Sequence, residues 1–155
     1  MNSNLLQVFQ KKIYSFFKLK KINHALISNS ALDTLTILKK NNFHAFIVGG
    51  AVRDILMGYK PKDFDIATNA TPEQVRSIFK RSRIIGRRFK LVHVIYGREI
   101  IEVSTFRAKP REKIKMSNGV LKDNEYGSIK EDAERRDFTI NALYYDVEDK
   151  NIIDF

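Results

Sequence analysis

The period of the apolar residues changes at Gly49 and Gly50, and this change constrains the fold more than any other feature of the chain. Residues 45–48 are a continuous apolar run that is typical of a buried strand, and the two glycines end it. Residues 51–57 then follow a helical pattern that stops at Gly58. The sequence therefore predicts a strand, a glycine turn and a helix, within a sheet that has helices packed against it.

Segments with strand and helix patterns alternate along the rest of the chain. Gly97 and Arg98 separate two apolar runs and predict a hairpin. Residues 107–125 are polar and unpatterned, and we expect a loop there. This order predicts an α+β fold, with a mixed or antiparallel sheet flanked by helices. The predicted helices begin at Ser30, Thr71 and Ser128, and the predicted strands cover residues 63–67, 91–96, 99–106, 142–147 and 151–155.

The composition fits one domain with a polyanionic partner. The chain has 155 residues, with 28 Lys and Arg against 18 Asp and Glu, and a formal net charge of +10. Nucleic acid, nucleotide or an anionic membrane surface would match that charge. The absence of cysteine excludes disulfides, thiolate catalysis and zinc sites built on sulfur. No apolar run approaches the roughly 20 residues of a membrane-spanning helix, so we expect no integral membrane association.

Residues 1–24 form a separate stretch with a basic amphipathic pattern. Apolar residues recur at helical spacing between Leu5 and Phe17, and lysines lie among and after them. A helical extension packed on the domain and a helix that contacts RNA or a membrane surface both fit this pattern. We therefore expect an extension at residues 1–24 and a single domain at residues 25–155.

Asp63 and Asp65 are the strongest candidates for catalytic residues. Side chains two positions apart in a strand project from the same face, so both carboxylates would point to one place. Their mutual repulsion is relieved when a divalent cation lies between them, and Mg²⁺ is the natural candidate. A pair of exposed carboxylates at a turn is the alternative interpretation.

The glycine turn supplies a second part of the candidate site. Gly49 and Gly50 have no side chains that would obstruct a phosphate, and backbone N–H groups at the start of the following helix attract anions. Arg53, one turn into that helix, can reach back to the same anion. Together with Asp63 and Asp65, the turn predicts a site for a nucleoside triphosphate and its metal ions.

Two further acids compete for the role of third metal ligand. Glu102 is a charged residue inside an apolar strand, where a two-metal site could use it. Asp137 is the other candidate, and it would complete the metal site or accept a hydrogen bond from a ribose hydroxyl. Arg136, next to it, could hold the triphosphate. Residues 80–90 are rich in Lys and Arg and include Phe89, which fits either an RNA track or a solvated loop.

Three stretches of the chain resemble, in order, the head-domain motifs of the class II tRNA nucleotidyltransferase and bacterial poly(A) polymerase family. They are residues 48–54 (VGGAVRD), 62–65 (KDFD) and 135–143 (RRDFTINAL). Within that family, residues 85–94 and 101–107 look more like the poly(A) polymerase branch. The resemblance implies a DNA polymerase beta-like nucleotidyltransferase fold.

The resemblance also implies roles for individual residues. Asp63 and Asp65 would be metal ligands, and Asp137 would be a further active-site acid. The residues that we expect to contact the nucleotide are Gly49, Gly50, Arg53, Arg136 and Asn141.

These residues and the resemblance together predict template-independent addition of nucleotides to RNA. We expect a cytoplasmic enzyme of the polynucleotide adenylyltransferase type that adds AMP from ATP to RNA 3′ ends, with two Mg²⁺ ions as cofactors. The alternatives are a CCA-adding tRNA nucleotidyltransferase, which shares all three motifs, and a catalytically incomplete RNA-binding fragment. The fragment is an alternative because the family continues into neck, body and tail domains, absent from this sequence, which we expect to select the base and to bind much of the RNA.

Overall fold

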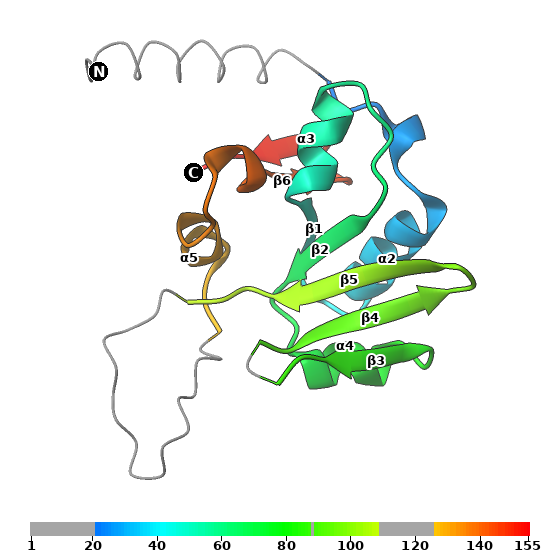
Figure 1. Cartoon of the computed structure of the whole chain (residues 1–155). Helices are drawn as coiled ribbons and strands as arrows, with labels where there is room; N and C mark the ends of the chain where they lie inside the picture. The colour runs from blue at the N-terminus through cyan, green and yellow to red at the C-terminus, as the bar shows by residue number, and fades with distance from the viewer. Residues whose placement is uncertain (1–20, 88, 109–125) are drawn as a thin grey trace.

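Figure 1 shows the computed structural model of the chain, which describes residues 21–87, 89–108 and 126–155. Most of the basic extension expected at residues 1–24 and most of the loop expected at residues 107–125 therefore lie outside the described residues. Where the structure describes the chain, no helix is both long and apolar enough to cross a membrane.

A seven-stranded mixed sheet forms the centre of the fold, in the spatial order β3-β4-β5-β2-β1-β6-β7. The neighbours β2 and β5 run parallel, and the other neighbouring pairs run antiparallel. The predicted mixed sheet with flanking helices is thus confirmed. The strands are β1 (Ala45–Val48), β2 (Phe64–Thr68), β3 (Ser82–Ile85), β4 (Leu91–Tyr96), β5 (Glu99–Thr105), β6 (Tyr144–Asp146) and β7 (Asn151–Ile153).

Helices flank this sheet (Figure 1), and several of them begin at a side-chain cap. Thr71 and Ser128 each form a capping box. The cap hydroxyl accepts a hydrogen bond from a backbone N–H of the helix, and the side chain of Gln74 or Glu131 accepts one from the backbone N–H of the cap residue. Ser28 caps the first long helix two residues before its predicted start. The helices are η1 (His24–Leu26), α2 (Asn29–Lys40), α3 (Gly50–Leu56), α4 (Pro72–Ile78), α5 (Ile129–Glu134) and η2 (Thr139–Asn141).

Alternation along β1 divides the core between the two faces of the sheet. Ala45 and Ile47 belong to a large apolar cluster that includes side chains of α2, α3 and α4. Phe46 and Val48 belong to a smaller cluster that includes Ala133 of α5. Because β1 is buried on both faces, its sequence is a continuous apolar run. The turn at Gly49 and Gly50, called the glycine corner below, therefore follows a strand that is buried on both faces.

The edge strand β3 was not predicted from the sequence. Ser82–Ile85 lie within the basic stretch at residues 80–90 and pair with β4, but only Ser82 among them is buried. A strand with so little burial has no apolar alternation that could reveal it. The hairpin between β4 and β5 is confirmed, with Gly97 at φ 60° in its turn.

Candidate functional site

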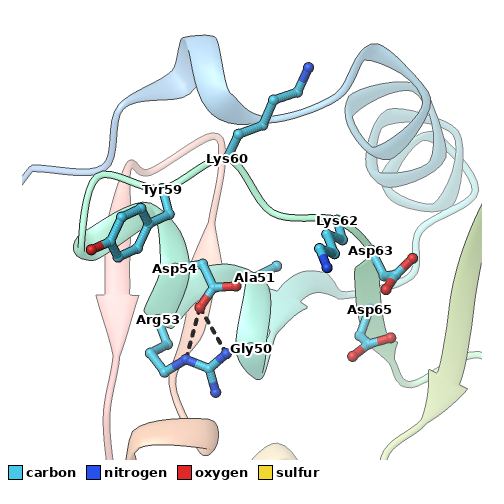
Figure 2. Close-up of a pocket in the computed structure, with 9 residues that line it drawn as sticks. All are labelled: Gly50, Ala51, Arg53, Asp54, Tyr59, Lys60, Lys62, Asp63 and Asp65. Atoms are coloured by element: carbon cyan, nitrogen blue, oxygen red, sulfur yellow. Dashed lines mark hydrogen bonds and ion pairs between the residues drawn. The ribbon is translucent and has the colours of Figure 1, made fainter.

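Asp65 lies on the face of β2 opposite to α2 and α4. Its neighbours Phe64 and Ile66 belong to the large apolar cluster, so the Asp65 side chain points to the other side of the sheet. Asp63 directly precedes β2, which begins one residue later than predicted. Figure 2 shows the two carboxylates on the same side of this segment, and both line one pocket. The structure therefore brings the two predicted acids together.

The glycine corner lies directly beside Asp65. The antiparallel register of β1 and β2 pairs Val48 with Asp65, and Gly49 follows Val48. Gly49 has φ 76° and ψ −138°, a backbone conformation that glycine adopts without strain and other residues do not. A methyl group built at Gly49 would lie 3.8 Å from Oδ2 of Asp65 and 3.8 Å from Nη1 of Arg136. The bare corner is therefore within reach of both a carboxylate and a guanidinium group.

A pocket of about 460 Å³ opens at this corner (Figure 2). Its lining combines acids that suit a divalent cation with bases that suit a phosphate. Tyr59, Lys60 and Lys62 had no predicted role in the site, although they lie between the glycine turn and the two acids. The lining residues are Gly50, Ala51, Arg53, Asp54, Tyr59, Lys60, Lys62, Asp63 and Asp65.

Acidic neighbours crowd the carboxylate of Asp65. The parallel register of β2 and β5 pairs Asp65 with Glu102, which lies on the same face of the sheet. Burial raises the pKa of Asp65, the charges of Glu102 and Asp63 also raise it, and the charge of Arg136 opposes them. The net pKa shift is upward, so the ionised form of Asp65 is disfavoured in this environment. A divalent cation would relieve that cost, and the oxygen donors present fit Mg²⁺.

Glu102 shares a face with Asp65 but does not line the pocket. Its Oε1 atom lies 3.4 Å from Nε2 of His93 on β4, and its side chain is 48% exposed. Within the described parts of the chain, no three His, Asp or Glu side chains are close enough to form a metal site as they stand. The assignment of Glu102 as a metal ligand therefore stays a prediction.

Arg53 and Asn141 meet from distant parts of the sequence. Nη1 of Arg53 donates to Oδ1 of Asn141 at 3.0 Å, and Nε of Arg53 donates to Oδ1 of Asp54 at 2.9 Å. The backbone N–H of Gly49 donates to the carbonyl of Leu143 at 3.3 Å, so this group is not available to an anion. At Gly49 the Arg136 guanidinium group therefore supplies the positive charge that the bonded backbone N–H does not.

Two residues that the sequence reasoning missed hold Arg136. Its Nε donates to the hydroxyl of Tyr144 at 3.2 Å, and its Nη2 donates to Oδ2 of Asp132 at 3.1 Å. Asp132 is only 1% exposed. The signal that could have revealed it is its spacing of three and four residues from Arg135 and Arg136, which is the spacing of ion pairs along a helix.

Asp137 lies between α5 and η2, where it is exposed, and it is not among the residues that line the pocket. Its role as an active-site acid stays a prediction. In the basic stretch at residues 80–90, the described residues other than Ser82 are exposed, and Lys90 forms an ion pair with Glu73 at 3.0 Å. The role of this stretch as an RNA track also stays a prediction.

The solved structures that this chain resembles include nucleotide-adding enzymes. The chain aligns with the Bacillus stearothermophilus CCA-adding enzyme in complex with CTP at a TM-score of 0.65 and 39% identity, covering 80% of this chain and 28% of that one. It aligns with a tRNA nucleotidyltransferase complexed with a primer tRNA and an incoming ATP analog at a TM-score of 0.57 and 32% identity, covering 79% of this chain and 34% of that one. The mixed sheet, the paired acids and these likenesses define a nucleotidyltransferase domain of the DNA polymerase beta-like fold.

The sequence relatives narrow that class. Residues 45–155 match the family described as the Poly A polymerase head domain. Poly(A) polymerase I of Haemophilus influenzae is 52% identical over 136 residues, which are 83% of this chain and 30% of that protein. The chain therefore belongs to the poly(A) polymerase head-domain family, as its three motifs predicted. It spans less than a third of the length of this relative.

Proposed function

We propose that this domain is the catalytic head of an RNA nucleotidyltransferase that adds AMP from ATP to RNA 3′ ends without a template. The observation that carries the proposal is the corner at Gly49, which both the Asp65 carboxylate and the Arg136 guanidinium approach. The higher identity to poly(A) polymerase I than to the CCA-adding enzyme supports AMP addition over CCA addition.

The proposal includes two Mg²⁺ ions held by Asp63 and Asp65. Oxygen ligands suit this hard cation, and the crowding that raises the pKa of Asp65 is the kind that a bound cation offsets. When bound, Mg²⁺ would activate the RNA 3′-hydroxyl and neutralise charge on the triphosphate as pyrophosphate leaves. Glu102 and Asp137 remain the two candidates for a third ligand.

The chain's own residues would bind and orient the triphosphate. Gly49 and Gly50 leave room for phosphate oxygens, while Arg53 and Arg136 supply positive charge next to that space. Asn141 accepts a hydrogen bond from Arg53 and so limits the orientations of that guanidinium group. Positioning and charge neutralisation are the main contributions that a protein makes to phosphoryl transfer.

The test compares Asp63→Ala with Asp33→Ala in the chain supplied with neck, body and tail domains. Asp33 is an exposed acid on α2, so its replacement is a matched control. The assays are Mg²⁺-dependent ATP binding and incorporation of labelled AMP into an RNA primer. We expect Asp63→Ala to abolish incorporation and Asp33→Ala to leave it unchanged. Near-normal incorporation by the Asp63→Ala variant would remove the hypothesis.

The likeness to the CTP-bound CCA-adding enzyme keeps a second function open. Incorporation of CTP before ATP onto tRNA that lacks its terminus would favour CCA addition, whereas long adenylate tails on general RNA would favour polyadenylation. Binding of ATP and Mg²⁺ without turnover, even when neck, body and tail domains are supplied, would favour a non-catalytic RNA-binding domain. The need for those domains in RNA binding, like the cytoplasmic location, is part of the proposal.

A further inference from the structure

Asp132 is the most enclosed charged side chain among the described residues, with 1% of it exposed. Its Oδ1 accepts from the backbone N–H of Arg107 at 3.1 Å and from Nε and Nη2 of Arg135 at 2.9 and 2.5 Å. Its Oδ2 accepts from the Tyr144 hydroxyl at 2.6 Å and from Nη2 of Arg136 at 3.1 Å. Both carboxylate oxygens are therefore fully used by partners within the protein.

These partners keep Asp132 ionised. Burial would raise its pKa, but the hydrogen bond from Tyr144, the charges of Arg136 and Arg135, and the backbone N–H of Arg107 together hold its pKa below the usual range. A buried carboxylate that lost these partners would be strongly destabilising, and the two arginines would equally lose their counter-charge. The cluster is therefore a coupled unit.

The cluster joins three elements of the fold at one point. Arg107 follows β5, Asp132 lies on α5, and Tyr144 begins β6. The helix α5 has only six residues and would not hold a side chain still by itself. Its anchorage to β5 and β6 through Asp132 supplies the rigidity that the short helix lacks.

Arg136 is oriented by this cluster. The Tyr144 hydroxyl holds its Nε, and Asp132 holds its Nη2. The remaining nitrogen, Nη1, is the one that lies 3.8 Å from the position of a methyl group built at Gly49. Two nitrogens of the guanidinium group are thus tied back into the protein, and the third faces the corner.

We infer that Asp132 is a positioning residue that fixes Arg136 in the orientation needed to bind the triphosphate at the Gly49 corner. This inference rests on the function proposed above, because it requires a nucleotide at that corner. Asp132 acts through Arg136 and does not itself contact the ligand. A pre-oriented guanidinium group loses less side-chain entropy when a phosphate binds, so removing Asp132 weakens nucleotide binding.

The first experiment measures the Kd of ATP, in the presence of Mg²⁺, for the whole chain and for Asp132→Asn. The asparagine keeps the shape and removes the charge, and we expect the Kd to rise about tenfold. Asp146→Asn is the matched control, because Asp146 is also a partly buried acid in an ion pair, with Lys39 at 2.6 Å. The control should lower the thermal midpoint and leave the Kd unchanged. An unchanged Kd in Asp132→Asn overturns the inference.

A double-mutant cycle separates positioning from general destabilisation. In the Arg136→Ala background, Asp132→Asn should have no further effect on the Kd, since the residue through which it acts is gone. Additive losses would overturn the inference. If Asp132→Asn does not fold, Tyr144→Phe removes only the hydroxyl shared by Asp132 and Arg136 and should weaken binding in the same non-additive way. If Arg136→Ala binds ATP as tightly as the unmodified chain, the inference fails, whereas failure of the proposed nucleotide site itself would appear as unchanged Mg²⁺-dependent ATP binding in Asp63→Ala.

Discussion

Replacing Gly49 with alanine tests whether the bare corner is a phosphate site. The substitution adds one methyl group at a backbone position with φ 76° and ψ −138°. The nearest atoms outside the local chain, on Asp65 and Arg136, would be 3.8 Å away, which is an ordinary contact distance. The ligand-free protein therefore meets backbone strain but no steric clash.

The size of each effect follows from this geometry. Backbone strain of this kind costs on the order of 1–3 kcal/mol. In a chain of this length, 1 kcal/mol lowers the thermal midpoint by about 2–4 °C, so Gly49→Ala should lower it by roughly 2–12 °C. A phosphate that fills the corner would collide with the new methyl group, and we expect the affinity for ATP to fall by at least about tenfold, or 1.4 kcal/mol.

Gly97→Ala is the matched control, because it introduces backbone strain at a position away from the proposed nucleotide site. Gly97 has φ 60° in the β4–β5 turn, and a methyl group built there has no atom within 4 Å. Its strain costs about 1–2 kcal/mol, so the thermal midpoint should fall while the Kd of ATP stays the same. Thermal unfolding and calorimetric titration with ATP and Mg²⁺ measure both quantities. The reasoning is refuted if Gly49→Ala folds and binds ATP as tightly as Gly97→Ala.

Three further changes test other parts of the structure. Burial raises the pKa of Asp146, but its bonds from Lys39 outweigh this effect and lower the pKa, so its carboxylate stabilises the fold above the unfolded pKa and loses that effect in acid. In urea titrations, the stability deficit of Asp146→Asn should shrink as the pH falls below about 4, and a constant deficit would contradict this account. Leu38 is 0% exposed, and Leu38→Ala should lower the free energy of unfolding by about 2–5 kcal/mol in the same assay. Asp65→Asn should raise the thermal midpoint of the metal-free chain, because it removes one charge beside Glu102, and it should abolish any Mg²⁺-dependent rise in that midpoint.

Much of the fold was predictable because apolar periodicity reports burial. The strand before Gly49, the hairpin at Gly97 and the capped helix start at Thr71 all follow from local patterns. The edge strand at residues 82–85 does not, because most of its side chains are exposed and leave no apolar alternation. The parallel pairing of β2 and β5 also has no local signal, since it is set by packing of the whole sheet.

In the candidate site too, local sequence patterns predicted some residues and not those that depend on tertiary contacts. The spacing of Asp63 and Asp65 predicted that both carboxylates lie together, and they do, although Asp63 directly precedes β2 and only Asp65 lies within the strand. The meeting of Asp132 and Tyr144 depends on how α5 docks against β6, and no spacing within the sequence specifies that contact. The ion pairs of Asp132 with Arg135 and Arg136 have the local spacing of a helix, whereas its hydrogen bond from Tyr144 needs the tertiary fold.

The central position of β1 links nucleotide binding to the assembly of the sheet. Gly49 extends from β1, Asp65 lies on its neighbour β2, and Tyr144, which holds Arg136, lies on its other neighbour β6. Contacts between residues this far apart in sequence require long loops to close, which slows folding. A nucleotide would bind only to chains in which β1, β2 and β6 are paired. Its binding would therefore shift the folding equilibrium toward the complete sheet.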